Sequence, residues 1–85
     1  MLFRSVFGQA SWSEARRELE RAVALDSTRI FHRLDLARVE AERNDPAAAL
    51  AQLRRVAELP DRFAADTIYR REAGELLLKL QKRQR

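Results

Sequence analysis

The segment that decides the fold runs from Thr28 to Leu59 and reads TRIFHRLDLARVEAERNDPAAALAQLRRVAEL. Apolar residues recur with the 3.6-residue period of an α-helix on both sides of Asn44-Asp45-Pro46. Asparagine tolerates the left-handed conformation at the end of a helix, aspartate caps the next helix, and proline suits its first position. The segment therefore predicts two antiparallel helices, over residues 28–43 and 46–58, joined by a short turn.

The residues before this hairpin repeat the pattern of its second helix. When the sequence is shifted by 34 residues, a small or apolar residue occupies each of four matched slots. The matched residues are Ala15, Leu19, Ala22 and Leu25 against Ala49, Leu53, Val56 and Leu59. A period of 34 residues is typical of solenoids built from helical hairpins. We therefore expect the flanking segments to be parts of the same repeated unit.

Three further helical segments are expected outside the hairpin. Ser11-Trp12-Ser13-Glu14 has the spacing of a capping box and predicts a helix over residues 12–25. A final helix is expected over about residues 64–81. Its start lies between Asp61 and Thr67, and within this range Asp66 is the better N-cap. Residues 1–8 read as a partial helix, because four apolar residues there share one helix face and a glycine follows them.

These elements predict an all-α fold, with antiparallel helical hairpins arranged as a superhelix. Residues 1–85 form a single domain of four main helices and a short N-terminal helical segment. The helix over residues 28–43 is apolar on more than one face, as a helix with several neighbours should be. The predicted core consists of Trp12, Ala15, Leu19, Ala22, Ile30, Leu34, Ala37, Leu50, Leu53, Val56, Leu76, Leu77 and Leu80.

The central hairpin also carries a family resemblance. Leu36-Ala37 precedes Asn44-Asp45 by seven residues, and the spacing Ala49-x-x-x-Leu53-x-x-Val56 follows. Over about residues 10–60 this arrangement resembles the tetratricopeptide repeat (TPR), W-x-x-L-G-x-x-Y followed by A-x-x-x-F and a closing proline. The chain departs from that pattern at Arg33 and Glu40, which fill the Trp and Tyr slots, and at Asn44, which replaces the turn glycine. The resemblance implies about 1.5 repeats and a final capping helix.

The resemblance implies a scaffold that binds a protein segment in a groove lined by the first helix of each hairpin. The residues expected to face this groove are Phe31, Leu34, Asp35, Arg38, Glu42 and Tyr69. Relatives that grip a C-terminal carboxylate use Lys and Asn at such positions, so we expect no carboxylate clamp where Phe31 and Leu34 stand. Ordinary packing between helices is the alternative role for these two residues.

Composition argues against catalysis and against metal or cofactor binding. The 85 residues suffice for one small domain, and the chain has no cysteine to supply disulfides, thiolate ligands or thiol nucleophiles. His32 is the only histidine, and no second ligand stands at metal-binding spacing. Gly8 and Gly74 are the only glycines, so no glycine-rich phosphate loop is present. We expect a binding protein and not an enzyme.

The net charge of +4 lies mainly at the C-terminal end, where residues 61–85 hold seven basic and four acidic residues. This cluster leaves nucleic-acid binding as the alternative function, through Arg70, Arg71, Lys79, Lys82, Arg83 and Arg85. Glu72 and Glu75 interrupt the cluster, only Tyr69 is interleaved with it, and no recognition motif is visible. We therefore favour a protein partner over nucleic acid.

The apolar runs are far shorter than the roughly 20 residues of a membrane-spanning helix. Residues 1–7 hold their basic residue inside the apolar run and lack the apolar stretch of a secretory signal. The expected location is therefore the cytoplasm. A chain that has already lost a signal peptide is the alternative.

Self-association is expected because the first hairpin is incomplete. A full first helix would begin about sixteen residues before the turn near Ala10, whereas the chain supplies residues 1–8. The apolar face of residues 12–25 would then be partly uncovered, and a homodimer or higher oligomer would cover it. The expected contact residues are Leu2, Phe3, Val6, Phe7 and Trp12. The alternatives are that residues 1–7 fold back, or that the chain belongs to a longer array.

Overall fold

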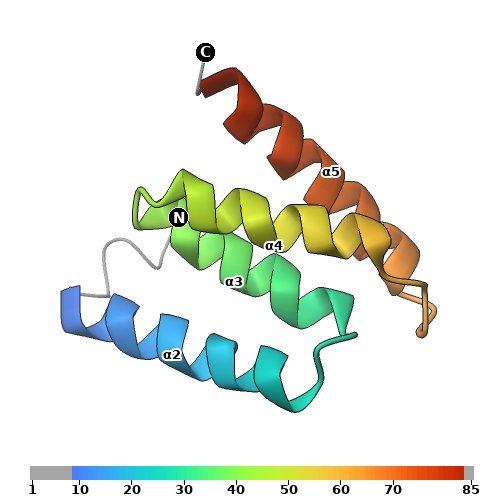
Figure 1. The fold of residues 1–85 in the computed structure, drawn as a ribbon, viewed down its shortest axis with the longest axis horizontal. Helices are drawn as coiled ribbons and strands as arrows, with labels where there is room; N and C mark the ends of the chain where they lie inside the picture. The colour runs from blue at the N-terminus through green and yellow to red at the C-terminus, as the bar shows by residue number, and fades with distance from the viewer. Residues whose placement is uncertain (1–8, 84–85) are drawn as a thin grey trace.

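Four α-helices make up most of residues 9–83, the part of the chain that the computed structural model describes (Figure 1). They are α2 (Gln9–Leu25), α3 (Ile30–Glu42), α4 (Pro46–Glu58) and α5 (Asp66–Arg83). Residues 9–83 contain no strand, so the predicted all-α fold with four main helices is confirmed. The partial helix predicted over residues 1–8 lies outside the described residues.

The turn between α3 and α4 has the predicted chemistry. Asn44 adopts a positive φ of 62°, in the left-handed region that asparagine tolerates. The Asp45 carboxylate accepts a hydrogen bond from the Ala48 backbone N–H at 3.3 Å, and Pro46 opens α4. At its other end α4 stops at Glu58, because Pro60 disfavours helical geometry in Leu59, which is extended. The predicted bounds of this helix, 46–58, are those observed.

The other three helices begin two or three residues away from their predicted first residues. The helix α2 begins at Gln9, so Ser11 lies inside it and the predicted capping box does not start it. The helix α3 begins two residues late, because Thr28 Oγ1 donates to Asp26 Oδ1 at 3.0 Å within a turn. Asp66 does begin α5, yet its carboxylate accepts from the backbone N–H groups of Arg62 and Phe63 at 2.7 and 2.9 Å, ordering the loop before the helix.

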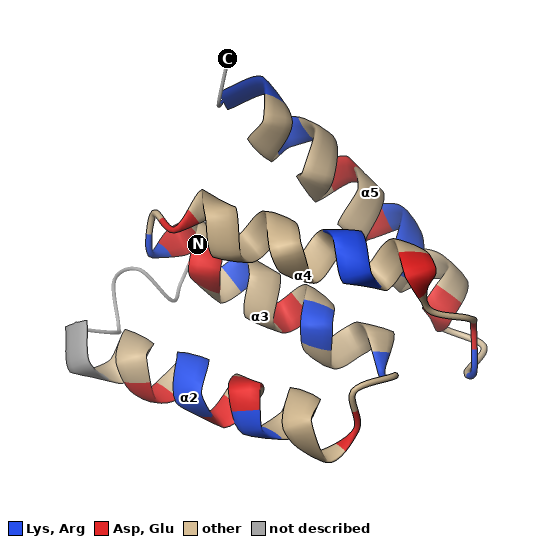
Figure 2. Cartoon of the chain, viewed as in Figure 1, with Lys and Arg blue, Asp and Glu red and all other residues tan. Residues whose placement is uncertain are grey.

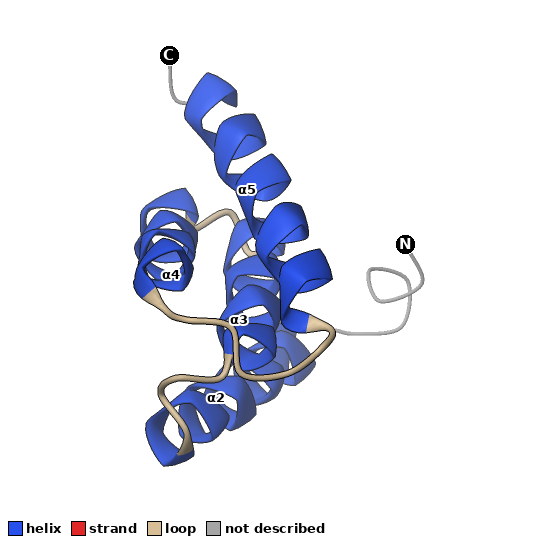
Figure 3. Ribbon diagram, turned by 90° about the vertical axis from the view of Figure 1, so that its right-hand side faces the viewer, coloured by secondary structure: helices blue, strands red, loops and turns tan. Residues whose placement is uncertain are grey.

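The helix α3 lies at the centre of the fold. It contacts α2, α4 and α5, whereas α4 and α5 contact each other and α2 contacts only α3 among the described helices. Figure 3 shows α4 and α5 above α3 and α2 below it. The helices α2 and α3 are antiparallel, since Arg16 pairs with Glu40 and Arg43 donates to Ser13. The helices α3 and α5 run in the same direction, because Tyr69 stacks on Phe31 and Glu72 pairs with Arg38.

The buried core comes from α3, α4, Leu59 and α5. Its apolar members are Ile30, Leu34, Leu36, Ala37, Ala49, Leu50, Leu53, Val56, Leu59, Ala73 and Leu80. Leu36 is buried together with Ile30 and Leu34 because α3 has neighbours on several sides. Leu76 and Leu77 pack against this core in half-buried positions. The four predicted core residues of α2, namely Trp12, Ala15, Leu19 and Ala22, are likewise only half-buried.

Candidate functional site: a groove between α2, α3 and α5

A groove with a volume of about 660 Å³ lies over α3, between α2 and α5. The helices α2 and α5 both contact α3 but not each other, so α3 forms the floor. The lining residues are Trp12, Ala15 and Leu19 of α2, Asp35, Arg38, Val39, Ala41 and Glu42 of α3, and Leu76, Lys79, Leu80 and Arg83 of α5. The helix α4 contributes none of them, so the groove and α4 lie on different faces of α3.

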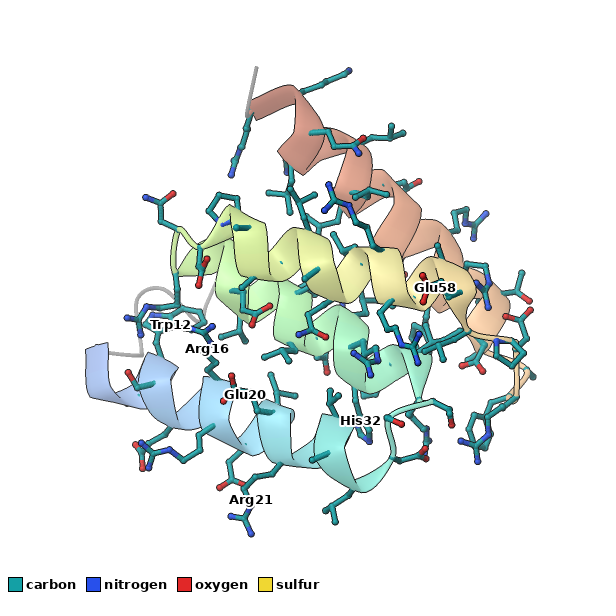
Figure 4. All side chains as sticks on the ribbon, viewed as in Figure 1. Trp12, Arg16, Glu20, Arg21, His32 and Glu58 are labelled. Atoms are coloured by element: carbon teal, nitrogen blue, oxygen red, sulfur yellow. The ribbon has the colours of Figure 1, made fainter. Side chains whose placement is uncertain are left out.

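Large apolar side chains in the groove keep part of their surface exposed. Trp12, Leu19, Val39 and Leu76 are half-buried, while Leu80 is 2 % exposed and belongs to the core. In Figure 4, Trp12 and Arg16 project from α2 toward α3, whereas Arg21 points away from the molecule. An apolar lining with a few charged groups suits a ligand that presents apolar side chains.

Charged side chains surround this apolar surface. Arg38 forms an ion pair with Asp35, at 3.3 Å between Nη1 and Oδ1, and another with Glu72 of α5. Burial raises the pKa of the Asp35 carboxyl, and the nearby Arg38 guanidinium opposes that shift. Lys79 and Arg83 are exposed and stand toward the C-terminal end of α5. The lining therefore holds three cations, Arg38, Lys79 and Arg83, together with the carboxylates of Asp35 and Glu42.

A buried ionic cluster ties α2 to the α3–α4 turn beside the groove. Glu40 of α3 is 2 % exposed, and its Oε2 lies 3.4 Å from Arg16 Nη2. The same nitrogen lies 3.4 Å from Asp45 Oδ2, and Arg16 also pairs with Glu20. Burial raises the pKa of Glu40 to about 6, with Arg16 opposing the shift and Asp45 and Glu20 adding to it. The other oxygen of Glu40, Oε1, is buried without a hydrogen-bond partner among the described residues.

The structure brings together some of the predicted partner-binding residues. Asp35, Arg38 and Glu42 all line the groove. Phe31 and Tyr69 lie outside its lining and stack on each other, with ring centroids 5.0 Å apart. Leu34 is completely buried in the core, so it presents no surface to a partner and its predicted place in the groove is wrong. The side chain of Leu34 points between helices because α3 is covered on more than one face.

Several residues that line the groove were not predicted to do so from the sequence. Leu76, Lys79, Leu80 and Arg83 line it because α5 crosses α3, and that crossing leaves no local pattern in the sequence; Val39 lines it from α3 itself. The sequence gives one indication of the groove: the apolar face of residues 12–25, which includes Leu19, is expected to be partly uncovered. Trp12, predicted at an oligomer contact, also lines the groove. The other predicted contact residues, Leu2, Phe3, Val6 and Phe7, lie outside the described residues.

The basic residues predicted as a nucleic-acid-binding cluster do not share one role in the structure. The guanidinium of Arg70 donates to Asp61 Oδ1 at 2.8 Å and to the Val56 carbonyl at 3.0 Å, so it holds the end of α4. Arg71, Lys79, Lys82 and Arg83 are exposed, and Arg85 lies outside the described residues. Figure 2 shows basic and acidic residues interleaved along the helices. This distribution does not form a continuous basic surface on the described part of the chain.

His32 is half-buried, and its ring lies 6.0 Å from that of Phe31. Among the described residues, no three His, Cys, Asp or Glu side chains are grouped so as to hold a metal ion. None of the helices in the described part of the chain has the length and apolar character needed to cross a membrane.

Comparison with known proteins adds no relative to this description. No model of a protein family matches the chain, and no curated protein or solved structure is significantly similar to it.

Proposed function

We propose that this chain is a non-catalytic, TPR-like interaction module that binds a segment of a partner protein in the groove between α2, α3 and α5. The observation that carries the proposal is the half-buried apolar surface of Trp12, Leu19, Val39 and Leu76 under a charged rim. Apolar surface rimmed by polar groups is a common feature of protein interaction sites. The cytoplasmic location expected from the sequence is part of the proposal.

The chemistry of the groove supports binding over catalysis. Among the residues that the structure describes, its lining contains no serine, threonine, cysteine or histidine that could act as a nucleophile or as a base near neutral pH. Of its two carboxylates, Asp35 is engaged by Arg38. Charged groups of this kind at the rim of an apolar surface fix the orientation and specificity of a bound segment.

A pair of substitutions on α2 tests the groove. Leu19→Glu puts a carboxylate into the apolar lining, whereas Leu25→Glu puts the same group at a position that is 88 % exposed and outside the groove. Partners recovered by the wild-type chain should be lost with Leu19→Glu and retained with Leu25→Glu. With a purified partner, Leu19→Glu should weaken binding by about tenfold or more, since a desolvated carboxylate costs over 1 kcal/mol. Equal recovery by both variants would remove the groove from the proposal.

We also propose that the chain self-associates. The support is the peripheral position of α2, in which no residue from Ser11 to Leu25 is fully buried, together with the apolar residues predicted at the contact. Light scattering coupled to size-exclusion chromatography should give about twice the chain mass of 9.9 kDa at high micromolar concentration. Phe3→Glu/Phe7→Glu should then dissociate the oligomer. A mass that stays near 9.9 kDa for the wild-type chain rules self-association out.

A further inference from the structure

Two aromatic residues that the sequence predicts at a binding surface lie together outside the lining of the groove. Phe31 of α3 and Tyr69 of α5 stack with their ring centroids 5.0 Å apart and their planes inclined by 37°. Both side chains are half-buried, so part of each ring is accessible from solvent. The accessible face of an aromatic ring attracts cations, and arginine more often than lysine.

A carboxylate stands about one helical turn after each of these rings. Asp35 follows Phe31 by four residues on α3. Glu72 follows Tyr69 by three residues on α5, so each acid shares a helix face with its aromatic neighbour. Both acids bond to one arginine, because Arg38 donates from Nη1 to Asp35 Oδ1 and from Nη2 to Glu72 Oε1. Phe31, Asp35, Tyr69 and Glu72 thus make up an aromatic–acidic patch on α3 and α5.

The charge of the aromatic–acidic patch is not balanced. Its two carboxylates stand against one guanidinium, that of Arg38, which leaves one formal negative charge. Burial raises the pKa of the Asp35 carboxyl by more than Arg38 and His32 lower it. Arg38 bonds to one oxygen of each carboxylate, so Oδ2 of Asp35 and Oε2 of Glu72 can still accept a hydrogen bond.

Other cations near the start of α3 and α5 are engaged elsewhere. Arg70 donates from Nη2 to Asp61 Oδ1 at 2.8 Å, and Arg33 donates from Nε to a carbonyl of the α2–α3 turn at 3.0 Å. Arg29 lies over the ring of Phe63, with its guanidinium carbon 4.3 Å from the ring centroid. Within residues 9–83 the patch is therefore served by Arg38, while a guanidinium over a ring is already a contact of this fold.

We propose that the aromatic–acidic patch binds an arginine side chain of a partner protein segment, with the guanidinium over Tyr69 and hydrogen-bonded to Asp35 and Glu72. A guanidinium suits the patch better than an ammonium, because it stacks on a ring and donates several hydrogen bonds in one plane. The inference rests on the proposed function, since Asp35 also lines the groove, and it adds a basic residue to the bound segment.

The probe is a five-residue peptide with blocked ends, a central arginine and alanine at the other positions. One comparison peptide carries citrulline, which has the shape of arginine without its charge, and a second carries lysine. Tyr69 is the only tyrosine of the chain, so its ring resonances in proton NMR spectra report on the patch without ambiguity. Trp12 is the only tryptophan and lines the groove, so its indole resonance reports on the groove in the same spectra.

The arginine peptide should shift the Tyr69 ring resonances and bind with a Kd on the order of a few millimolar. It should bind at least about fivefold more tightly than the citrulline peptide, because only arginine forms the ion pairs and the cation–π contact. It should also bind more tightly than the lysine peptide. Equal binding of the arginine and citrulline peptides overturns the inference, and equal binding of the lysine peptide overturns the stacked guanidinium.

A pair of charge-removing substitutions locates the binding site. Glu72→Gln should weaken binding of the arginine peptide about threefold to fivefold, as expected for an accessible charge pair. Glu18→Gln changes the net charge equally and also breaks an exposed ion pair, with Arg21, which points away from the molecule (Figure 4). This control should leave the affinity unchanged. Circular dichroism checks that both variants keep the helices, and equal effects of the two substitutions would overturn the inference.

The two reporter residues separate this inference from the proposed function. Shifts of Trp12 without shifts of Tyr69 would place the peptide in the groove and overturn the patch. If Tyr69 is unaffected while Leu19→Glu still loses a partner that Leu25→Glu retains, the patch is wrong and the proposed function stands. If Tyr69 responds as expected while both variants recover the same partners, the patch stands and the groove is wrong.

Discussion

The helices α2 and α4 carry the same apolar pattern in the 34-residue register, yet they occupy different environments. On α4, Leu53 is 2 % exposed within the core cluster, whereas its counterpart Leu19 on α2 is half-buried at the groove. Among the helices of residues 9–83, α4 contacts two others and α2 contacts one, and this accounts for the difference. A periodic pattern therefore predicts which face of a helix is apolar, while the neighbouring helices determine how much of that face is buried.

The largest effect is expected from truncating the two matched leucines. Leu53→Ala should lower the free energy of unfolding by about 2 to 5 kcal/mol, because it leaves a cavity among buried side chains. Leu19→Ala should cost clearly less, below about 2 kcal/mol, because its surroundings are already partly open to water. Urea denaturation followed by circular dichroism gives both values. Equal losses at the two sites would show that α2 is packed as firmly as α4.

The buried ionic cluster gives the next largest effect, because it joins α2 to the hairpin. Glu40 has a pKa of about 6 in the folded chain, above its ordinary 4.5. The folded state therefore binds more protons than the unfolded state between about pH 4.5 and 6, so the contribution of Glu40 to stability falls as the pH rises through that window. Above it, the ionised buried carboxylate costs about 2 kcal/mol relative to the protonated form.

Glu40→Gln removes this titration. The variant should be more stable than the wild type by about 1 to 2 kcal/mol at pH 7, with a difference that shrinks as the pH falls from about 6 to about 4.5. Urea midpoints at several pH values measure that difference, and the wild-type chain serves as the reference for all other titrating groups. A variant less stable than the wild type at pH 7 would mean that the Arg16 ion pair outweighs the cost of burying Glu40.

A smaller effect is expected on the outer face of α5, remote from the α2 and α4 comparison. Gly74 lies inside this helix, and a Cβ added there would meet nothing within 4 Å. Gly74→Ala should raise the free energy of unfolding by up to about 1 kcal/mol, because alanine favours the helix. Thermal denaturation can detect the change. A loss of stability would show that α5 packs differently at this position.

The sequence was most informative where structure is decided by neighbouring residues. Asn44, Asp45 and Pro46 have the conformations and the capping bond that their side chains favour, and α4 has its predicted bounds. It was least informative about contacts between helices. The prediction that Leu34 faces the groove is wrong, because Leu34 is fully buried. The sequence of a helix with several apolar faces does not show which face its neighbours cover.

The candidate site shows the same division. Asp35, Arg38 and Glu42 were assigned to the groove from their positions along one helix. Lys79 and Arg83 reach the groove only because α5 crosses α3. In the sequence alone, basic residues near the C-terminal end of a helix are already explained by the helix dipole, so nothing pointed to a groove. Glu40 has no aromatic ring to mark it as a core residue, and its burial against Arg16 depends on the docking of α2.

The most direct test of the central claim, that α2 is the incompletely covered helix and that the groove ligand covers it, is hydrogen exchange resolved by residue. Backbone amides of α2 should exchange through a lower opening free energy than those of α3 and α4, by about 1 kcal/mol or more, because α2 has a single neighbour among the described helices. Addition of a partner that binds the groove should slow exchange in α2 more than in α4, because α2 lines the groove and α4 does not. Equal protection of α2 and α4 in the free chain, or added protection confined to α4, would contradict the account.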